Sequence, residues 1–284
     1  RNDEYYGRKP SMRRLIFRHT PEAGAQRLML EKGDIDMALD IDPADYPALE
    51  KNANVRLQYT PSLQVQFMMF NMKDPRFRNP KVFEAFRYLM DYDGLEKTLL
   101  KNDAKVRQSP VPVGVFGALP ESFRPFKLDL AKAKALLAEA GYANGFSAEV
   151  AVLASFPNVD LAQHLQANAE KVGVKLKLTQ MVGVQLFQRS RNRNFEIYIA
   201  GYGFNYPDAN NPMLRFAYNP DNSDAAKNTI SIAWRASWDP GPFINDTIRA
   251  AQVERDQKKR LEMYQELQRR YVATSPVIPL FQNQ

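Results

Sequence analysis

Acidic side chains are concentrated in one stretch of the sequence, where they could act as metal ligands. Asp34, Asp36, Asp40, Asp42 and Asp45 offer carboxylate oxygens within a short span. A calcium loop of the EF-hand type places such oxygens at alternate positions and needs a glycine for its turn. Here large apolar residues stand between the acids and that glycine is missing. The spacing therefore favours the polar face of a strand followed by a helix cap, and we predict no metal site.

The residues that most often carry enzyme chemistry are few and widely separated. The sequence has two histidines, no cysteine, and no nucleophile-elbow, phosphate-loop or dinucleotide-binding pattern. His164 lies at the edge of an apolar helical stripe, which favours a packed side chain over a ligand. Asp91 and Asp93 could form an acid–base pair, but helix capping explains both. We expect a protein with no catalytic residue and no cofactor; the alternative is a hydrolase or another enzyme on an α/β scaffold.

Composition indicates a folded chain of one or two domains. The 284 residues are 44% hydrophobic and 25% charged, and no stretch is long and apolar enough to span a bilayer. The net charge of +7 includes two basic runs, Arg189–Arg193 and Arg255–Arg260. We interpret both runs as solvent-exposed helix faces. Because no aromatic-rich RNA-binding signature accompanies them, we expect no nucleic-acid partner.

Strand and helix patterns alternate along the sequence. This alternation indicates a protein of the α/β class. Residue 108 begins a loop rich in proline and glycine that extends to residue 125, long enough to be functional. Helix ends are marked by Asp42, Asp91 and Asp129 as caps and by Gly33 and Gly141 as stops. The period of the apolar residues predicts strands at 12–18, 35–41, 55–59, 64–70, 146–153, 174–178, 195–200 and 276–281, and helices at 21–31, 79–89, 129–140, 158–172, 243–251 and 261–271.

Four segments combine specific residues in a fixed order along the chain. They are Asn2–Gly7 (NDEYYG), Leu30–Asp36 (LEKGDID), Phe77–Phe86 (FRNPKVFEAF) and Asp129–Gly145 (DLAKAKALLAEAGYANG). Together they resemble the extracytoplasmic solute-binding proteins of peptide, opine and nickel ABC importers, the family 5 type. The last segment is the most specific of the four, and the resemblance extends over essentially the whole chain.

The resemblance implies the C-terminal half of a periplasmic-binding-protein-like molecule whose two lobes close on a ligand by a hinge motion. It implies that residues 1–61 are a remnant of the first lobe, 62–277 the second lobe, and 278–284 a return segment to the first lobe. The implied function is the substrate-binding component of an ABC importer, which captures a peptide-like or other small amphiphilic solute. Such a protein works in the periplasm, or outside the cytoplasm at the membrane, and we expect a monomer that delivers its ligand to an inner-membrane permease.

The resemblance also places the ligand site at Gly201–Ala209 (GYGFNYPDA). Peptide-binding relatives have an aspartate that pairs with the peptide's amino group where this chain has Asn205, and a neutral amide cannot form that charge-assisted bond. Asp208 is the substitute acid nearby. The alternative is a tyrosine-rich turn packed on its own lobe. The predicted ligand-binding residues are Tyr202, Gly203, Phe204, Asn205 and Asp208.

Overall fold

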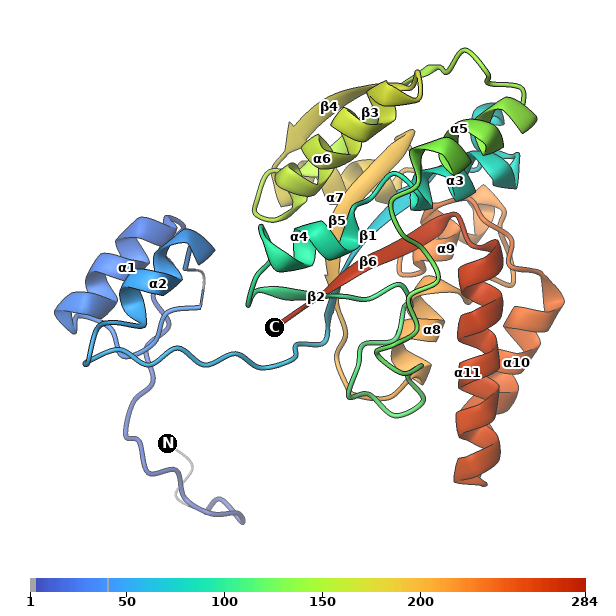
Figure 1. Cartoon of the computed structure of the whole chain (residues 1–284). Coiled ribbons are helices and arrows are strands. Elements are labelled where there is room, and N and C mark those ends of the chain that lie inside the picture. Colours follow the sequence, from blue (N-terminus) through green and yellow to red (C-terminus); the bar gives the residue numbers. More distant parts are fainter. Residues whose placement is uncertain (1–3, 40) are drawn as a thin grey trace. The chain divides into compact units, whose positions relative to one another are not determined.

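The computed structural model of the chain describes residues 4–39 and 41–284. The chain divides into two compact units, a smaller unit (Arg1–Gln58) and a sheet unit (Tyr59–Gln284) (Figure 1). Three residues used in the sequence predictions, Asn2, Asp3 and Asp40, lie outside the described residues. The assignment of residues 1–61, 62–277 and 278–284 to particular lobes of a larger protein stays a prediction.

The smaller unit is helical where its caps predict helices. Helix α1 (Ala23–Lys32) ends at Gly33, whose φ of 77° is accessible to glycine at little cost. The Asp42 side chain accepts a hydrogen bond from the N–H of Ala44 at 2.9 Å and begins η1 (Pro43–Asp45), which leads into α2 (Tyr46–Leu49). The helix predicted at 21–31 and the cap at Asp42 are therefore confirmed.

The strands predicted in the smaller unit are wrong. Residues 4–39 and 41–58 contain no strand, although strands were expected at 12–18, 35–41 and 55–59. Leu15, Phe17, Met37 and Leu39 alternate with polar residues as a strand would, but each side chain is exposed. An alternating pattern becomes a strand only when a neighbouring segment completes the hydrogen-bond ladder, and within these residues no segment does so.

The sheet unit confirms the α/β class and all five strands predicted for it. Six strands of the described residues form one sheet in the order β2-β6-β1-β5-β3-β4 (Figure 1). Strand β3 is parallel to β4 and β5, whereas β1 is antiparallel to β5 and β6, and β2 is antiparallel to β6. The strands are β1 (Gln64–Phe70), β2 (Ala104–Val106), β3 (Ser147–Leu153), β4 (Lys175–Met181), β5 (Ile197–Gly203) and β6 (Val277–Asn283).

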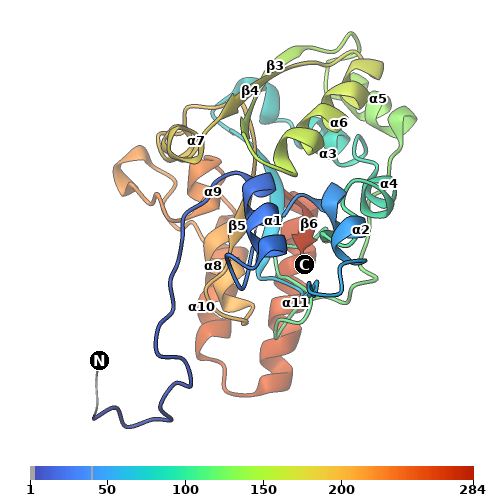
Figure 2. The same cartoon turned by 90° about the vertical axis from the view of Figure 1, so that its left-hand side faces the viewer.

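Two apolar cores lie on opposite faces of this sheet. Along β1, Met68 and Phe70 join one core, while Val65, Phe67 and Met69 join the other, as the two-residue period of a strand requires. In Figure 1 and in the turned view of Figure 2, α10 and α11 run side by side. The core that contains Phe70 is covered by four helices: α3 (Pro80–Arg87), α4 (Tyr92–Lys97), α5 (Leu130–Glu139) and α6 (Asn158–Lys171). The core that contains Phe67 is covered by five: α7 (Gly183–Arg191), α8 (Asn210–Phe216), α9 (Ile232–Arg235), α10 (Gly241–Val253) and α11 (Gln257–Thr274).

The residues that could suggest acid–base chemistry have structural partners. Asp91 accepts from the N–H of Gly94 at 3.0 Å and caps α4, as predicted. Nε2 of His164 accepts from the backbone N–H of Asp91 at 3.1 Å, and burial lowers the pKa of this histidine. His164 is therefore a packed, half-buried side chain that joins α6 to α4.

The interpretation of the basic runs as solvent-exposed faces is correct for only part of each run. Arg191 is exposed, but Arg193 is 6% exposed and its guanidinium carbon lies 3.7 Å from the centroid of the Trp234 ring. Arg260 is partly buried and forms an ion pair with Asp208. Both partners come from distant segments, so the local sequence of a run does not reveal them.

Candidate functional site

The predicted ligand segment occupies the end of β5 and the turn that follows it. Tyr202 and Gly203 are the last residues of β5, where they face Val65 and Gln64 of β1. The N–H of Phe204 continues the ladder by donating to the carbonyl of Leu63 at 3.1 Å. The sheet thus fixes the backbone up to Phe204, and α8 begins directly after the turn.

The aromatic side chains of Tyr202 and Phe204 lie on the same face of the strand. Their ring centroids are 5.4 Å apart, and both pack against Phe216 of α8, at 5.9 Å for Tyr202 and 5.5 Å for Phe204. Phe204 is buried, whereas Tyr202 is half-buried. A Cβ added to Gly203 would meet no atom within 4 Å, so open space borders the backbone there. Phe204 is thus a core residue that supports an accessible Tyr202.

The Asn205 side chain is exposed at the start of the turn. The buried side chain of Asn211 holds the backbone of this turn. When the amide oxygen of Asn211 faces the turn, it accepts from the backbone N–H groups of Asn205 at 2.8 Å and Tyr206 at 3.1 Å. Within the described residues the Asn205 amide itself has no hydrogen-bond partner. An exposed amide on a fixed backbone can both donate to and accept from a polar ligand.

Asp208, the substitute acid of the segment, is already paired within the protein. Its two carboxylate oxygens accept from Arg260 of α11, each at 2.8 Å, and one of them also accepts from the N–H of Asn210 at 2.9 Å. The guanidinium of Arg260 lies over the rings of Phe116 and Tyr264. A ligand ammonium group would have to compete with this bidentate pair for the Asp208 carboxylate.

The Asp208–Arg260 pair makes the stability of the protein depend on pH. Burial alone would raise the pKa of Asp208, but the hydrogen bonds from Arg260 and Asn210 and the charge of Arg260 outweigh burial and lower it. The folded pKa is thus below the unfolded one, so the pair stabilises the protein above about pH 4 and is lost as pH falls through the folded pKa.

We expect Asp208→Asn to lower the free energy of unfolding by about 1 kcal/mol near neutral pH, the upper range for accessible ion pairs. The difference from wild type should stay constant above about pH 5 and shrink as the pH falls from about 5 to about 2, because the stabilisation is lost only as the pH passes from the unfolded pKa through the lower folded pKa of Asp208. Urea unfolding at a series of pH values measures it. A difference that stays constant across this range would contradict the assignment.

A row of amide side chains borders the same end of the sheet, and the sequence predictions missed it. Gln66 is 1% exposed; its Nε2 donates to Oδ1 of Asn283 at 3.0 Å, and within the described residues its Oε1 has no partner. A Cβ at Gly201 would lie 2.6 Å from Nε2 of Gln64 and 2.8 Å from Oε1 of Gln66. The sequence did contain a sign of these amides, because Gln64 and Gln66 interrupt the otherwise apolar strand β1.

The loop that follows β2 supports the site turn from behind. The carbonyl of Phe116 accepts from the N–H of Ala209 at 2.9 Å. Gly117 follows with a φ of 85°, and a Cβ there would lie 2.7 Å from the Ala209 Cβ, so only glycine fits without a shift. The Gly117 carbonyl accepts from Nε2 of Gln268 on α11 at 2.6 Å. Helix α11 therefore holds the turn twice, through Arg260 and through this loop.

Comparisons with known proteins agree with this fold and place the chain among binding proteins. The sequence profile described as bacterial extracellular solute-binding proteins, family 5 Middle, matches residues 1–224. The dipeptide-binding protein of Escherichia coli (strain K12) is 26% identical over 274 residues, which cover 94% of this chain and 49% of that protein. The glutathione-binding protein GsiB of the same strain is 32% identical over 176 residues, covering 61% of this chain and 33% of that protein.

A solved structure shows the same architecture. The ABC transporter-associated periplasmic binding protein DppA from Helicobacter pylori, in complex with the peptide STSA, superposes with a TM-score of 0.86 at 24% identity, covering 99% of this chain and 54% of that one. The chain thus spans about half the length of DppA and of the dipeptide-binding protein. Of the helices in the described part of the chain, none is long and apolar enough to cross a membrane.

Proposed function

The chain belongs to the bacterial extracellular solute-binding proteins of family 5, and from this premise we propose that the whole protein is the substrate-binding component of an ABC importer. It captures a peptide-like or other small amphiphilic solute in the periplasm and delivers it, as a monomer, to a permease of the inner membrane. The observation that carries the proposal is the family match over residues 1–224. The dipeptide-binding and glutathione-binding relatives support a ligand of the peptide type.

The end of β5 supports this ligand class by its chemistry. Tyr202 offers an accessible aromatic face, Gly203 leaves the backbone open, and Asn205 presents a free amide. Small-molecule sites of this kind combine apolar area with a few fixed polar groups, which give orientation and specificity. A ligand with amide or hydroxyl groups along an apolar frame fits that combination, and Phe204 contributes to the site by backing Tyr202.

The importer function requires that the ligand leaves the protein chemically unchanged. We propose that binding involves no catalytic step and no cofactor; a hydrolase on the same scaffold is the alternative. Incubating the whole protein with a peptide and recovering it intact by mass spectrometry supports binding alone, and stoichiometric cleavage products would favour the hydrolase.

We expect Asn205→Asp in the whole protein to tighten the binding of peptides with a free amino terminus by about tenfold. A carboxylate at this exposed position would add a charge-assisted hydrogen bond to the ammonium group, worth about 1.5–3 kcal/mol. Wild-type Asn205 leaves that ammonium without a carboxylate, since Asp208 is paired with Arg260. Acetylated peptides should gain nothing from the substitution.

Calorimetric titration with paired free and acetylated peptides tests both the function and the role of Asn205. The matched control is Asn144→Asp, which adds the same charge at an exposed turn before β3. If wild type binds no peptide of either series, the proposed ligand class is wrong. If free-ended peptides bind tightly to wild type and Asn205→Asp changes nothing, only the role of Asn205 is contradicted.

A further inference from the structure

An open hollow of about 380 Å³ lies in the sheet unit, away from the β5 end that carries Tyr202 and Asn205. Its walls come from the segment after β1, the end of α7 with the loop that follows, and the segment from η3 (Asp224–Ala226) to α9. The lining side chains are strongly cationic for so small a space. They are Lys73, Arg191, Asn192, Arg193, Asp224, Lys227, Thr229 and Trp234.

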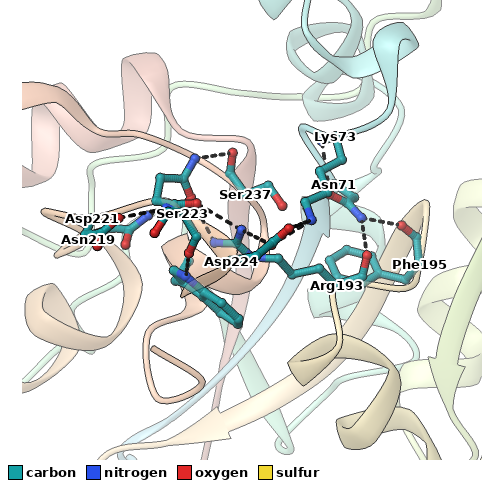
Figure 3. Close-up of polar contacts among 11 residues, drawn as sticks. Asn71, Lys73, Arg193, Phe195, Asn219, Asp221, Ser223, Asp224 and Ser237 are labelled. Carbon is teal, nitrogen blue, oxygen red and sulfur yellow. Dashed lines mark hydrogen bonds and ion pairs between the residues drawn. The ribbon is translucent and has the colours of Figure 1, made fainter. Parts of the chain in front are cut away.

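The floor of the hollow is rigid because Asn71 and Arg193 fasten its segments together (Figure 3). Nδ2 of Asn71 donates to the carbonyls of Arg193 at 2.8 Å and Phe195 at 2.9 Å. The buried Arg193 guanidinium stacks on Trp234 and donates to the carbonyl and side-chain oxygens of Asn222, both at 3.0 Å. Burial lowers the pKa of Arg193, and within the described residues its Nε has no partner.

The charges around this floor are unbalanced. Asp224 is the acid among the described lining residues, and it is held by Lys73 at 2.7 Å and by Arg193 at 2.9 Å. Arg191 and Lys227 are exposed, and neither has an ion pair within the described part of the chain. Behind the wall, the buried Arg235 donates to the carbonyl of Thr229 at 2.7 Å and adds a further positive charge.

Cations without counterions are an arrangement suited to an anion. The floor is held in place before binding by the bonds of Asn71 and Arg193, whereas Arg191 and Lys227 are exposed side chains that lose conformational freedom when the ligand arrives. Lysine and arginine are the side chains that bind phosphate oxygens, arginine through its planar fork and lysine as a point charge. Asp224 opposes anion binding, but Lys73 and Arg193 already neutralise it, which leaves Arg191 and Lys227 for the ligand.

We propose that this hollow binds an oxyanion of the phosphate class, either free in solution or as a lipid head group, with Arg191 and Lys227 as its principal partners. This site is separate from the peptide-type site at the end of β5 and does not depend on it. The proposal assigns to the cationic cluster a ligand that the importer function by itself does not require.

Calorimetric titration of the full chain with inorganic phosphate at low ionic strength tests the proposal. We expect Arg191→Gln and Lys227→Gln each to weaken phosphate binding by about threefold, and the double substitution by about tenfold, the size expected for accessible charge pairs. Asp224→Asn should tighten binding by about threefold, because it removes the opposing charge and frees Lys73. The three substituted positions, Arg191, Asp224 and Lys227, all have exposed side chains, so the fold should be retained, which circular dichroism checks.

The control is Lys258→Gln, which removes an exposed lysine on α11 that does not line the hollow. A second arm measures binding to phosphatidylglycerol vesicles against phosphatidylcholine vesicles, with phosphate as competitor. Vesicle binding that phosphate displaces and that Arg191→Gln weakens would assign the site to a head group; phosphate binding alone would assign it to a free anion. The proposal is overturned if phosphate does not bind, or if Lys258→Gln weakens binding as much as the substitutions in the hollow.

Discussion

Replacing Phe216 with alanine should lower the free energy of unfolding by about 3–5 kcal/mol, the usual cost of removing a buried phenylalanine ring. Phe216 is fully buried, and its ring centroid lies 5.0 Å from that of Phe67 and under 6 Å from those of Tyr202 and Phe204. The substitution would leave a cavity directly beneath the end of β5. Peptide binding by the whole protein should weaken as well, because Tyr202 would lose its support.

Urea unfolding of wild type and Phe216→Ala measures the loss of stability. The matched control is Phe243→Ala on α10, because Phe243 is 49% exposed and alanine there should cost about 1 kcal/mol or less. Equal effects of the two substitutions would contradict the role given to Phe216. A normal peptide affinity in a destabilised Phe216→Ala protein would show that Tyr202 needs no support from α8.

Replacing Gln268 with leucine should cost at least about 3 kcal/mol, because it leaves several buried polar groups unpaired. Oε1 of Gln268 accepts from Oγ of Ser109 at 2.8 Å and from the N–H of Leu119 at 3.2 Å. Nε2 donates to the carbonyls of Gly117 at 2.6 Å and Tyr264 at 2.8 Å. Leucine has a similar size but offers none of these bonds.

The effect should reach the candidate site because Gln268 anchors the loop that holds Ala209. We expect hydrogen exchange at the Ala209 amide to become faster in Gln268→Leu, in addition to the loss of stability measured by urea unfolding. Gln265→Leu, one turn away on α11 without a hydrogen bond from its side chain in the described residues, should change stability by about 0.5 kcal/mol or less. Slower or unchanged exchange at Ala209 would contradict the proposed link.

Local signals in the sequence predicted the longer strands and most of the longer helices of the sheet unit, but they missed β2, α7, α8 and α9. Asp91 and Asp129 cap helices because their carboxylates accept from N–H groups three residues further on, a spacing that the sequence alone specifies. The apolar runs of β1, β5 and β6 also predicted strands correctly. The smaller unit shows the limit of the same reasoning, since an alternating stretch such as 12–18 forms a strand only with a partner.

The residues of the candidate site were predicted from the resemblance to a family, and their long-range partners were not. The strand end at Tyr202 and the exposed turn at Asn205 followed from the resemblance to a family, but the pairing of Asp208 with Arg260 joins residues 52 positions apart. The support from Gln268 and the Gln66–Asn283 contact, whose partners are 217 positions apart, are of the same kind. Such contacts follow from the packed sheet, and no spacing in the sequence indicates them.

The position of β6 between β1 and β2 has a consequence for how the protein is made. During synthesis β1 emerges long before β6, and β2 pairs with no other strand than β6 among the described residues. Until residues 277–283 are in place, one edge of β1 stays open and β2 has no strand to pair with in the described part of the chain. Open strand edges favour association between chains. The sheet is therefore completed by a long-range pairing, and one edge of β1 stays open until β6 is inserted.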